Sequence, residues 1–190
     1  MQQGKLNPES PTVEKILTAA LTVFAEEGFA GARVDEIARR AGVNKAMLYY
    51  HVGDKAVLYE KVLVRNFDRL LGAVAEASTA DSSPADRLRK VIHTVTELVS
   101  SMPEHPRIIL REVAAGGASL PPAALSRMGQ AAAEVRRIVL DGIEDGSMRT
   151  VDPLLTHVAM IGAIVFGHAV RPIGELMQQL GLDMELVSPA

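Results

Sequence analysis

The spacing of apolar residues predicts helices along most of the chain. From Val13 to Phe24 apolar side chains recur every three or four positions, and the same period returns in later stretches. This period is typical of amphipathic helices. Ser-Pro pairs at 10–11 and 83–84 are typical helix starts, and Gly28 is placed to end the first helix. We find no convincing strand, so the pattern predicts an all-α fold of about nine helices.

Two short helices separated by a glycine turn follow the first helix. They are predicted over Val34–Ala41 and Lys45–His51, with Gly42 between them and Asn44 as the cap of the second. Two short helices joined in this way have the shape of a helix-turn-helix. The unit is predicted over residues 33–52, and its second helix is the candidate recognition helix.

The side chains of this second helix suit contact with DNA. Lys45 and Met47 are placed to reach base edges, and the ring-bearing run 49–51 (Tyr-Tyr-His) ends the helix. Phosphate accepts hydrogen bonds from Tyr and His, and a ring packs well on a thymine methyl group. Lys55, in the first turn of the next helix, can hold a further phosphate. The alternative for the three rings is a partly buried junction between two helices.

Charge and composition narrow the range of functions only a little. The chain has 190 residues and a net charge of −3, yet residues 33–55 hold five basic against three acidic side chains. A small local excess of this kind is compatible with nucleic-acid binding. There is no cysteine, no set of three metal ligands at suitable spacing and no phosphate-cradling glycine loop. We therefore predict no catalytic residues, no metal, no cofactor and no enzyme.

The second half of the chain contains a helix that is apolar on nearly all sides. It is predicted over Pro153–Val170, and Pro172 is predicted to begin a last helix that runs to about Val187. A helix without a polar face must be covered on both sides, and we infer that a second copy covers one of them. The interface residues predicted for this homodimer are Leu154, Val158, Ile161, Val165 and His168. His157 and His168 are interpreted as hydrogen-bonded interface histidines.

No membrane-spanning segment is predicted. The longest strongly apolar stretch, Val158–Gly167, has ten residues and would rise about 15 Å as a helix, roughly half of a bilayer. The polar first nine residues do not have the pattern of a secretory signal. A cytoplasmic protein without membrane contact is the expectation.

Three runs of residues together resemble the N-terminal domain of the TetR family of bacterial repressors. They are Ile16-Leu17-x-x-Ala20-Leu21-x-x-Phe24-x-x-x-Gly28-Phe29, then Val34-Asp35-Glu36-Ile37-Ala38-x-x-Ala41-Gly42-Val43-Asn44-Lys45, then Leu48-Tyr49-Tyr50-His51-Val52-x-Asp54-Lys55-x-x-Leu58. The resemblance implies a three-helix DNA-binding domain, residues 10–60, and a larger helical domain for ligand binding and dimerisation, residues 61–190. It also implies a homodimer that binds a palindromic operator and is released by a small molecule.

The resemblance assigns roles to individual residues of the first domain. By position, Tyr49, His51 and Lys55 would contact phosphate, whereas Lys45, Met47 and Tyr50 would face the bases. Asn44 would cap the recognition helix. Arg33 stands where the family usually has Thr or Ser, so the position keeps a phosphate contact but loses a capping oxygen, a change worth about 1 kcal/mol.

Candidates for the effector site come from the second domain. The resemblance places a small molecule among its helices, and the candidate residues are Met102, Arg107, Met128 and His93. The methionines are otherwise plain core or surface, and we interpret Arg107 and Arg111 as partners of Glu104 and Glu112. A ligand-responsive repressor is the main hypothesis. The alternatives are an effector-independent regulator of the same fold and, remotely, a small helical enzyme or metal-binding protein.

Overall fold

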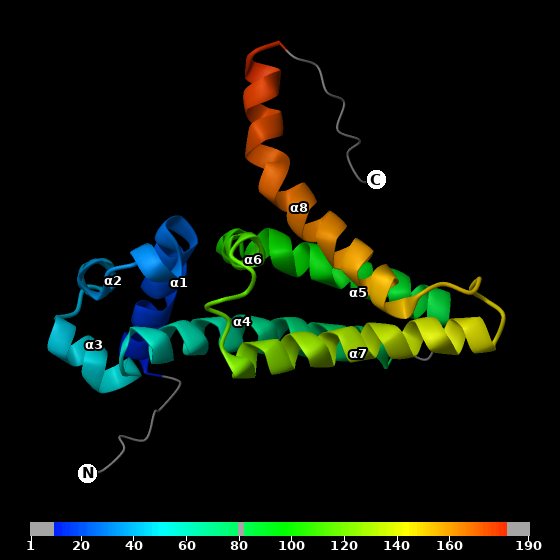
Figure 1. The fold of residues 1–190 in the computed structure, drawn as a ribbon, viewed down its shortest axis with the longest axis horizontal. Coiled ribbons are helices and arrows are strands. Elements are labelled where there is room, and N and C mark those ends of the chain that lie inside the picture. The colour runs from blue at the N-terminus through cyan, green and yellow to red at the C-terminus, as the bar shows by residue number, and fades with distance from the viewer. Residues whose placement is uncertain (1–9, 80–81, 182–190) are drawn as a thin grey trace.

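The computed structural model describes residues 10–79 and 82–181, and these residues form eight α-helices and no strand. The helices are α1 (Pro11–Gly31), α2 (Val34–Ala41), α3 (Lys45–Val52), α4 (Lys55–Ser78), α5 (Pro84–Ser101), α6 (Glu104–Ala114), α7 (Pro122–Glu144) and α8 (Pro153–Gln179). The all-α prediction is confirmed. Figure 1 shows α1 to α3 gathered at one end and α4 running from them alongside α7.

Two hydrophobic cores lie along α4. The first joins α1, α2, α3 and the first half of α4 to single buried residues of α6 and α7, and it includes Phe24, Ile37 and Leu48, all fully buried. The second joins the far half of α4 to α5 and α7, with Val91 and Ile138 at its centre. Because α4 belongs to both cores, it connects the helix-turn-helix end of the molecule to the rest.

Side-chain caps begin several of the helices, as their sequences predict. Asn44 Oδ1 accepts from Met47 N at 2.8 Å, and Asp54 Oδ1 accepts from Val57 N at 2.9 Å. Ser83 caps α5 in the same way. Ser10 and Arg33 occupy cap positions without a side-chain hydrogen bond, so the loss of a capping oxygen at Arg33 is confirmed.

Gly28 interrupts α1 rather than ending it. Its φ of 71° lies in the left-handed region, where a residue without Cβ is unstrained. One further turn then runs to Gly31, and Ala32 N donates to Gly28 O at 3.1 Å. The sequence identified the position of the break, and the structure adds the short turn after it.

The last two predicted helices are one. α8 continues through Pro172 to Gln179, so the predicted start of a new helix at Pro172 is wrong. A proline inside a helix removes one backbone hydrogen bond but does not always end the helix. The predicted extension to Val187 lies outside the described residues. In Figure 1 the second half of α8 rises away from the rest of the molecule.

The uninterrupted α8 also corrects the expectation about membranes. With 27 residues, it is long and apolar enough to cross a membrane by length and composition alone. The prediction of no such segment was made on a ten-residue stretch and is wrong on this criterion. The core helix of a soluble protein passes the same test, and here the helix is covered on one side by α5, α6 and α7.

Candidate nucleic-acid interface and internal cavity

A tight turn at Gly42 sets the angle between α2 and α3. Gly42 adopts the left-handed conformation, with φ 68° and ψ 31°, and Val43 N donates to Ala38 O at 3.0 Å. Leu48 and Val52 are fully buried and fix α3 on the first core. The geometry is that of a helix-turn-helix whose second helix has one face held by the core and the other free.

The free face of α3 carries the residues predicted to read DNA. Tyr50 is 80% exposed, and Met47 and Tyr49 are about half as exposed. The Tyr50 and His51 rings lie edge to face, with centroids 5.1 Å apart. The alternative of a buried aromatic junction therefore does not hold for Tyr50.

Several cations of this surface are already paired within the chain. Lys45 Nζ lies 2.9 Å from Asp35 Oδ1, and this carboxylate raises the pKa of the lysine. Arg39 and Arg40 both donate to Glu36, and hydrogen bonds from these two guanidinium groups lower the pKa of that carboxyl to about 2. Arg33 is exposed. The surface consequently presents much less free positive charge than its sequence contains.

Lys55 is held against the end of α1. Its Nζ donates to Ala30 O at 3.1 Å and to Ala32 O at 2.9 Å, and it lies 4.9 Å from the centre of the Phe29 ring. An ammonium group has three N–H donors, so one donor is left for a phosphate. Lys61 has a similar position at the end of α3, where Nζ donates to Val52 O at 2.9 Å.

The short helix α6 attaches the second half of the chain to α1 and α4. Arg111 donates to Ala25 O at 3.2 Å and to Glu26 O at 2.6 Å, and the buried Tyr59 hydroxyl donates to Glu112 Oε1 at 2.6 Å. Burial, with the hydrogen bond to the Glu112 carboxylate, raises the pKa of Tyr59. The predicted Arg111–Glu112 pairing is wrong, because each side chain instead reaches the DNA-binding end.

A largely apolar cavity of about 70 Å³, partly open to solvent, lies among α4, α5, α6, α7 and α8. Most of its lining is aliphatic, and it contains no Lys, Arg, Asp or Glu. The lining residues are Phe67, Leu70, Val74, Val95, Val99, His105, Ile109, Met128, Ala131, Val135, His157, Met160, Ile161 and Val165.

Two imidazole groups are the polar exception in this lining. The Nδ1 atoms of His105 and His157 are buried and have no hydrogen-bond partner. Burial lowers the pKa of His105 to about 4 and also lowers the pKa of His157. The ring of His105 packs edge to face on Phe67, with centroids 5.1 Å apart. Both rings are therefore neutral at pH 7, and each brings an unused polar atom to the cavity region.

The four residues predicted for an effector site do not lie together. Met128 lines the cavity, whereas Met102 is buried outside it, with Sδ 3.9 Å from Arg69 Nη1. His93 is 73% exposed and pairs with Glu97 at 3.3 Å. Sequence reasoning selected it as a polar residue in the right region, but its helix turns it outward.

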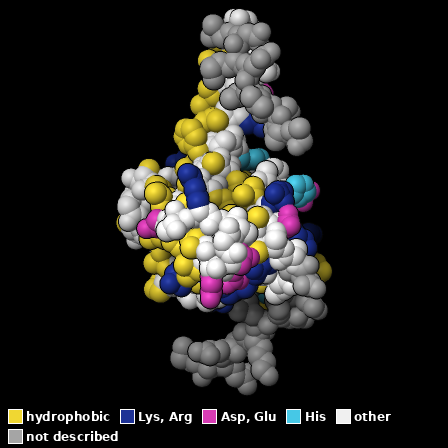
Figure 2. Space-filling model, turned by 90° about the vertical axis from the view of Figure 1, so that its right-hand side faces the viewer, with side chains coloured by type: hydrophobic (Ala, Val, Ile, Leu, Met, Phe, Trp, Pro, Cys, Tyr) yellow, Lys and Arg dark blue, Asp and Glu magenta, His cyan; other side chains and the backbone are white. Residues whose placement is uncertain are grey.

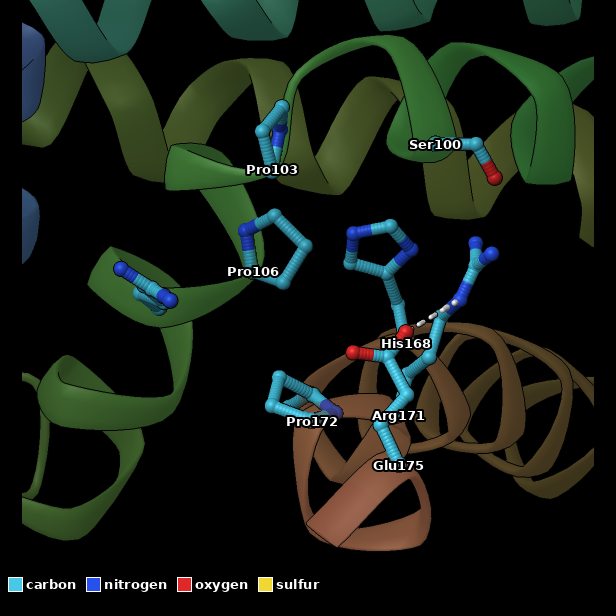
Figure 3. A pocket seen from close by; sticks show the side chains of 9 residues that line it. Ser100, Pro103, Pro106, His168, Arg171, Pro172 and Glu175 are labelled. Carbon is cyan, nitrogen blue, oxygen red and sulfur yellow. Dashed lines mark ion pairs between the residues drawn. The ribbon is translucent and has the colours of Figure 1, made fainter. Parts of the chain in front are cut away.

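Arg107 lies at a separate open cleft of about 260 Å³ between α5, α6 and α8. Figure 3 shows His168 on α8 pointing toward Pro106, beside the Arg171–Glu175 ion pair of 3.5 Å. The predicted pairing of Arg107 with Glu104 is not among the ion pairs of the described residues.

The predicted dimer residues fall on two different faces of α8. Leu154 and Val158 are exposed, but Ile161 and Val165 line the cavity, and Val165 is buried within the chain. Val165 is therefore not free for an interface, whereas His157, which also lines the cavity, is only partly buried and its interface role stays a prediction. The apolar side chains that α8 leaves exposed are Leu154, Leu155, Val158, Phe166, Ile173 and Leu176. Figure 2 shows hydrophobic side chains gathered along the rising part of this helix.

The residues that sequence reasoning missed are His105 and His157 in the cavity and Tyr59 and Glu112 at the junction. The period of α6 gave a usable signal, because His105, Ile108 and Glu112 lie on one side of that helix and are all buried. No comparable signal marks His157, since its helix is apolar all round.

A helix-turn-helix with an exposed recognition face, joined through one long helix to a second helical core, defines a class of DNA-binding transcriptional regulators. Two family models match the chain. Residues 16–62 match the bacterial regulatory proteins of the tetR family, and residues 81–168 match a tetracyclin repressor-like C-terminal domain. The chain belongs to the TetR family, whose members are transcriptional regulators and not enzymes.

Similar proteins agree with this assignment. The chain is 33% identical over 108 residues to the HTH-type transcriptional activator FasR of Mycolicibacterium smegmatis, covering 57% of this chain and 49% of that protein. It is 30% identical over 138 residues to the HTH-type transcriptional regulator RutR of Escherichia coli O157:H7, covering 73% and 65%. The chain thus spans about half to just under two thirds of these relatives.

The crystal structure of the TetR-family regulator PfmR from Thermus thermophilus has the same fold. It superposes with a TM-score of 0.69 and 23% identity over 81% of this chain and 84% of that one. At this identity the likeness extends to the fold alone.

Proposed function

We propose that the protein is a ligand-responsive transcriptional repressor that binds a palindromic operator as a homodimer in the cytoplasm. In the proposal the DNA-binding domain comprises residues 10–60 and the effector-binding and dimerisation domain residues 61–190. The observation that carries the proposal is the exposed face of α3, where Met47, Tyr49 and Tyr50 meet solvent on a helix-turn-helix scaffold.

Contacts with DNA are assigned to the residues around this face. In the proposal Met47 and Tyr50 meet base edges, whereas Tyr49, His51 and Arg33 meet phosphates. Asn44 holds the first turn of α3. Lys45 breaks its ion pair with Asp35 and contacts base edges instead. Lys55 donates its third N–H to a phosphate.

The second copy is proposed to cover α8. The exposed apolar side chains of this helix extend over its whole length, and its second half rises away from the other described helices (Figure 1). Pairing α8 with its mate would bury this surface and set two recognition helices about one DNA turn apart, roughly 34–36 Å or somewhat more. His168 and half-buried Ile161 lie at the edge of this interface.

Release by a ligand is supported by the position of α6 and α4. Both helices line the cavity, through His105 and Ile109 on α6 and Phe67 on α4. Both also hold the DNA-binding end, through Arg111 and the Tyr59–Glu112 pair. A ligand that widens the cavity therefore moves elements bonded directly to α1. It changes operator affinity only as far as it prefers the widened state.

The small size of the cavity favours a second candidate function. About 70 Å³ is well below the roughly 300 Å³ or more of typical ligand pockets. An effector-independent regulator of the same fold would keep such a core closed. The two candidates differ in whether any small molecule changes the affinity for DNA.

DNA binding is tested with the intergenic DNA beside the protein's own gene, by fluorescence anisotropy at two salt concentrations. We expect Tyr50→Ala and Lys45→Ala each to weaken binding by about tenfold or more, since a good base contact is worth roughly 1–3 kcal/mol. His93→Ala, exposed on α5, is the matched control and should bind like the parent. Equal affinity of all four proteins would overturn the assignment of α3.

A further inference from the structure

We propose that the internal cavity binds an uncharged, largely apolar molecule whose one hydrogen-bonding group is held by His105 and His157. The inference rests on the proposed function for its regulatory meaning, since this molecule would be the effector. Its chemical class is argued from the cavity alone.

The buried imidazoles identify the polar part of the ligand. His105 is only 5% exposed, lines the cavity and has an Nδ1 atom without a partner. His157 on α8 also lines the cavity and is partly buried, and its Nδ1 atom is likewise buried without a partner. Buried polar atoms are nearly always hydrogen-bonded in folded proteins. Two orphaned atoms at one apolar cavity therefore indicate a partner that the protein itself does not supply. A neutral imidazole offers one donor and one acceptor nitrogen, so a hydroxyl, ketone or amide group suits both.

The absence of charged side chains in the lining disfavours an ionic ligand. None of the residues that line it is Lys, Arg, Asp or Glu, and burial keeps the two histidines neutral at pH 7. A buried carboxylate or ammonium is costly unless a counter-charge pairs with it. An acid or amine of the same size must therefore bind far more weakly than a neutral molecule.

The ligand must also widen the cavity. A space of about 70 Å³ is smaller than the roughly 150 Å³ that holds benzene in an engineered cavity. Met128 and Met160 line it, and methionine adapts its shape more readily than other apolar residues. Ala131 on α7 also lines the cavity, and a larger side chain at this position would fill the space that the ligand needs.

The test uses four probes of equal chain length: 1-octanol, octanamide, octanoate and octylammonium. Binding to the full chain is measured by isothermal titration calorimetry at pH 7 without DNA. We expect 1-octanol and octanamide to bind at least about tenfold more tightly than either ion. The inference is overturned if an ion binds as tightly as the alcohol, or if none of the four probes binds.

Variants locate the binding. Ala131→Leu should abolish binding of 1-octanol, whereas Ala133→Leu, the same change at an exposed position of α7, should leave it unchanged. His157→Leu should weaken it roughly tenfold, His157→Asn should restore part of the loss, and exposed His93→Leu should have no effect. Circular dichroism melts show whether Ala131→Leu and His157→Leu fold. If one of them fails to fold, the binding measured with the other tests the inference. Binding that survives both would place the probe elsewhere and overturn the inference.

The same proteins separate this inference from the proposed function. Octanol that binds in the cavity without changing operator affinity would leave the ligand class standing and remove the effector role. Release of DNA by an ion, lost in Ala131→Leu, would keep the effector role of the cavity and overturn the ligand class.

Discussion

His105 shows how one buried side chain can serve binding at the expense of stability. It packs on Phe67, it has an unpartnered Nδ1 atom, and burial holds its pKa at about 4. A residue chosen for packing alone would be apolar at this position. The orphaned nitrogen is therefore better explained by a partner that arrives than by the fold.

Stability should fall as the pH drops from 7.5 to 5. The unfolded chain takes up a proton at His105 near pH 6.5, whereas the folded chain does so only near pH 4. Protonation between these values favours unfolding, with a cost of about 2 kcal/mol at pH 5. His157 changes stability in the same direction. Urea unfolding at the two pH values measures the difference.

His105→Gln removes this titration, so the pH dependence of its unfolding free energy should be smaller by about the same amount. His93→Gln, at an exposed position, should keep the parent's dependence. Identical slopes for the parent and His105→Gln would contradict a neutral buried imidazole.

Local features of single residues were predictable, and long-range ones were not. Asn44 was identified as a cap because a cap and its N–H lie three residues apart. Lys55 contacts Ala30 and Ala32, more than twenty residues away, so its sequence context suggested only a free cation. Tyr59 and Glu112, separated by 53 residues, gave no pairing signal at all.

At the scale of elements, α3 depends on the cap at its start. A helix of eight residues has few internal hydrogen bonds, so each satisfied N–H at its first turn matters. The Asn44 Oδ1 bond to Met47 N is the side-chain cap of this helix.

Asn44→Ala should lower the free energy of unfolding by about 1 kcal/mol. Ser10→Ala is the matched control, since Ser10 occupies the cap position of α1 without a side-chain hydrogen bond, and it should change stability by only a few tenths. Chemical denaturation of the two variants and the parent makes the comparison. A loss as large for Ser10→Ala would show that these caps do not act through the observed bond.

The helix α8 marks the limit of pattern reasoning for an element. Its position was predicted from its apolar run, but a helix apolar on nearly all sides has no period that tells the inner face from the outer. Val165 was therefore assigned outward although it is buried. Pro172 was interpreted as the start of a new helix because proline commonly ends a helix. A helix as long as α8 tolerates the loss of the one backbone hydrogen bond that proline removes.

For the whole molecule, the proposed dimer would bury the exposed apolar face of α8. Phe166→Glu places a charge on this face, where the parent side chain is 62% exposed. We expect a dimer to become a monomer, with operator affinity reduced by at least about tenfold because the two half-sites no longer bind together. Sedimentation equilibrium measures the mass.

Val113→Glu is the control for this experiment. Val113 is 68% exposed on α6 and is not part of α8, so the variant should remain dimeric. A parent protein that is monomeric at micromolar concentration, or that sediments with membranes, would reject the dimer interpretation.

The architecture as a whole was the most predictable level. Helix-period patterns, glycine breaks and the run from Val34 to Leu58 indicated the helix-turn-helix and its family resemblance before any geometry. The cavity was not predictable, because it is formed by five helices whose relative positions depend on packing between distant residues. Only Met128 among the predicted ligand residues lies in it.

The internal pairing of Lys45 with Asp35, and of Arg39 and Arg40 with Glu36, has a consequence for the search of a genome. Affinity for arbitrary DNA comes almost entirely from cations that displace counterions from phosphates. A surface on which three of the five cations in residues 33–55 already face a carboxylate is held less tightly by the millions of competing sites on a chromosome. Few copies are then sequestered away from the operator, so its occupancy follows the number of regulator molecules in the cell closely.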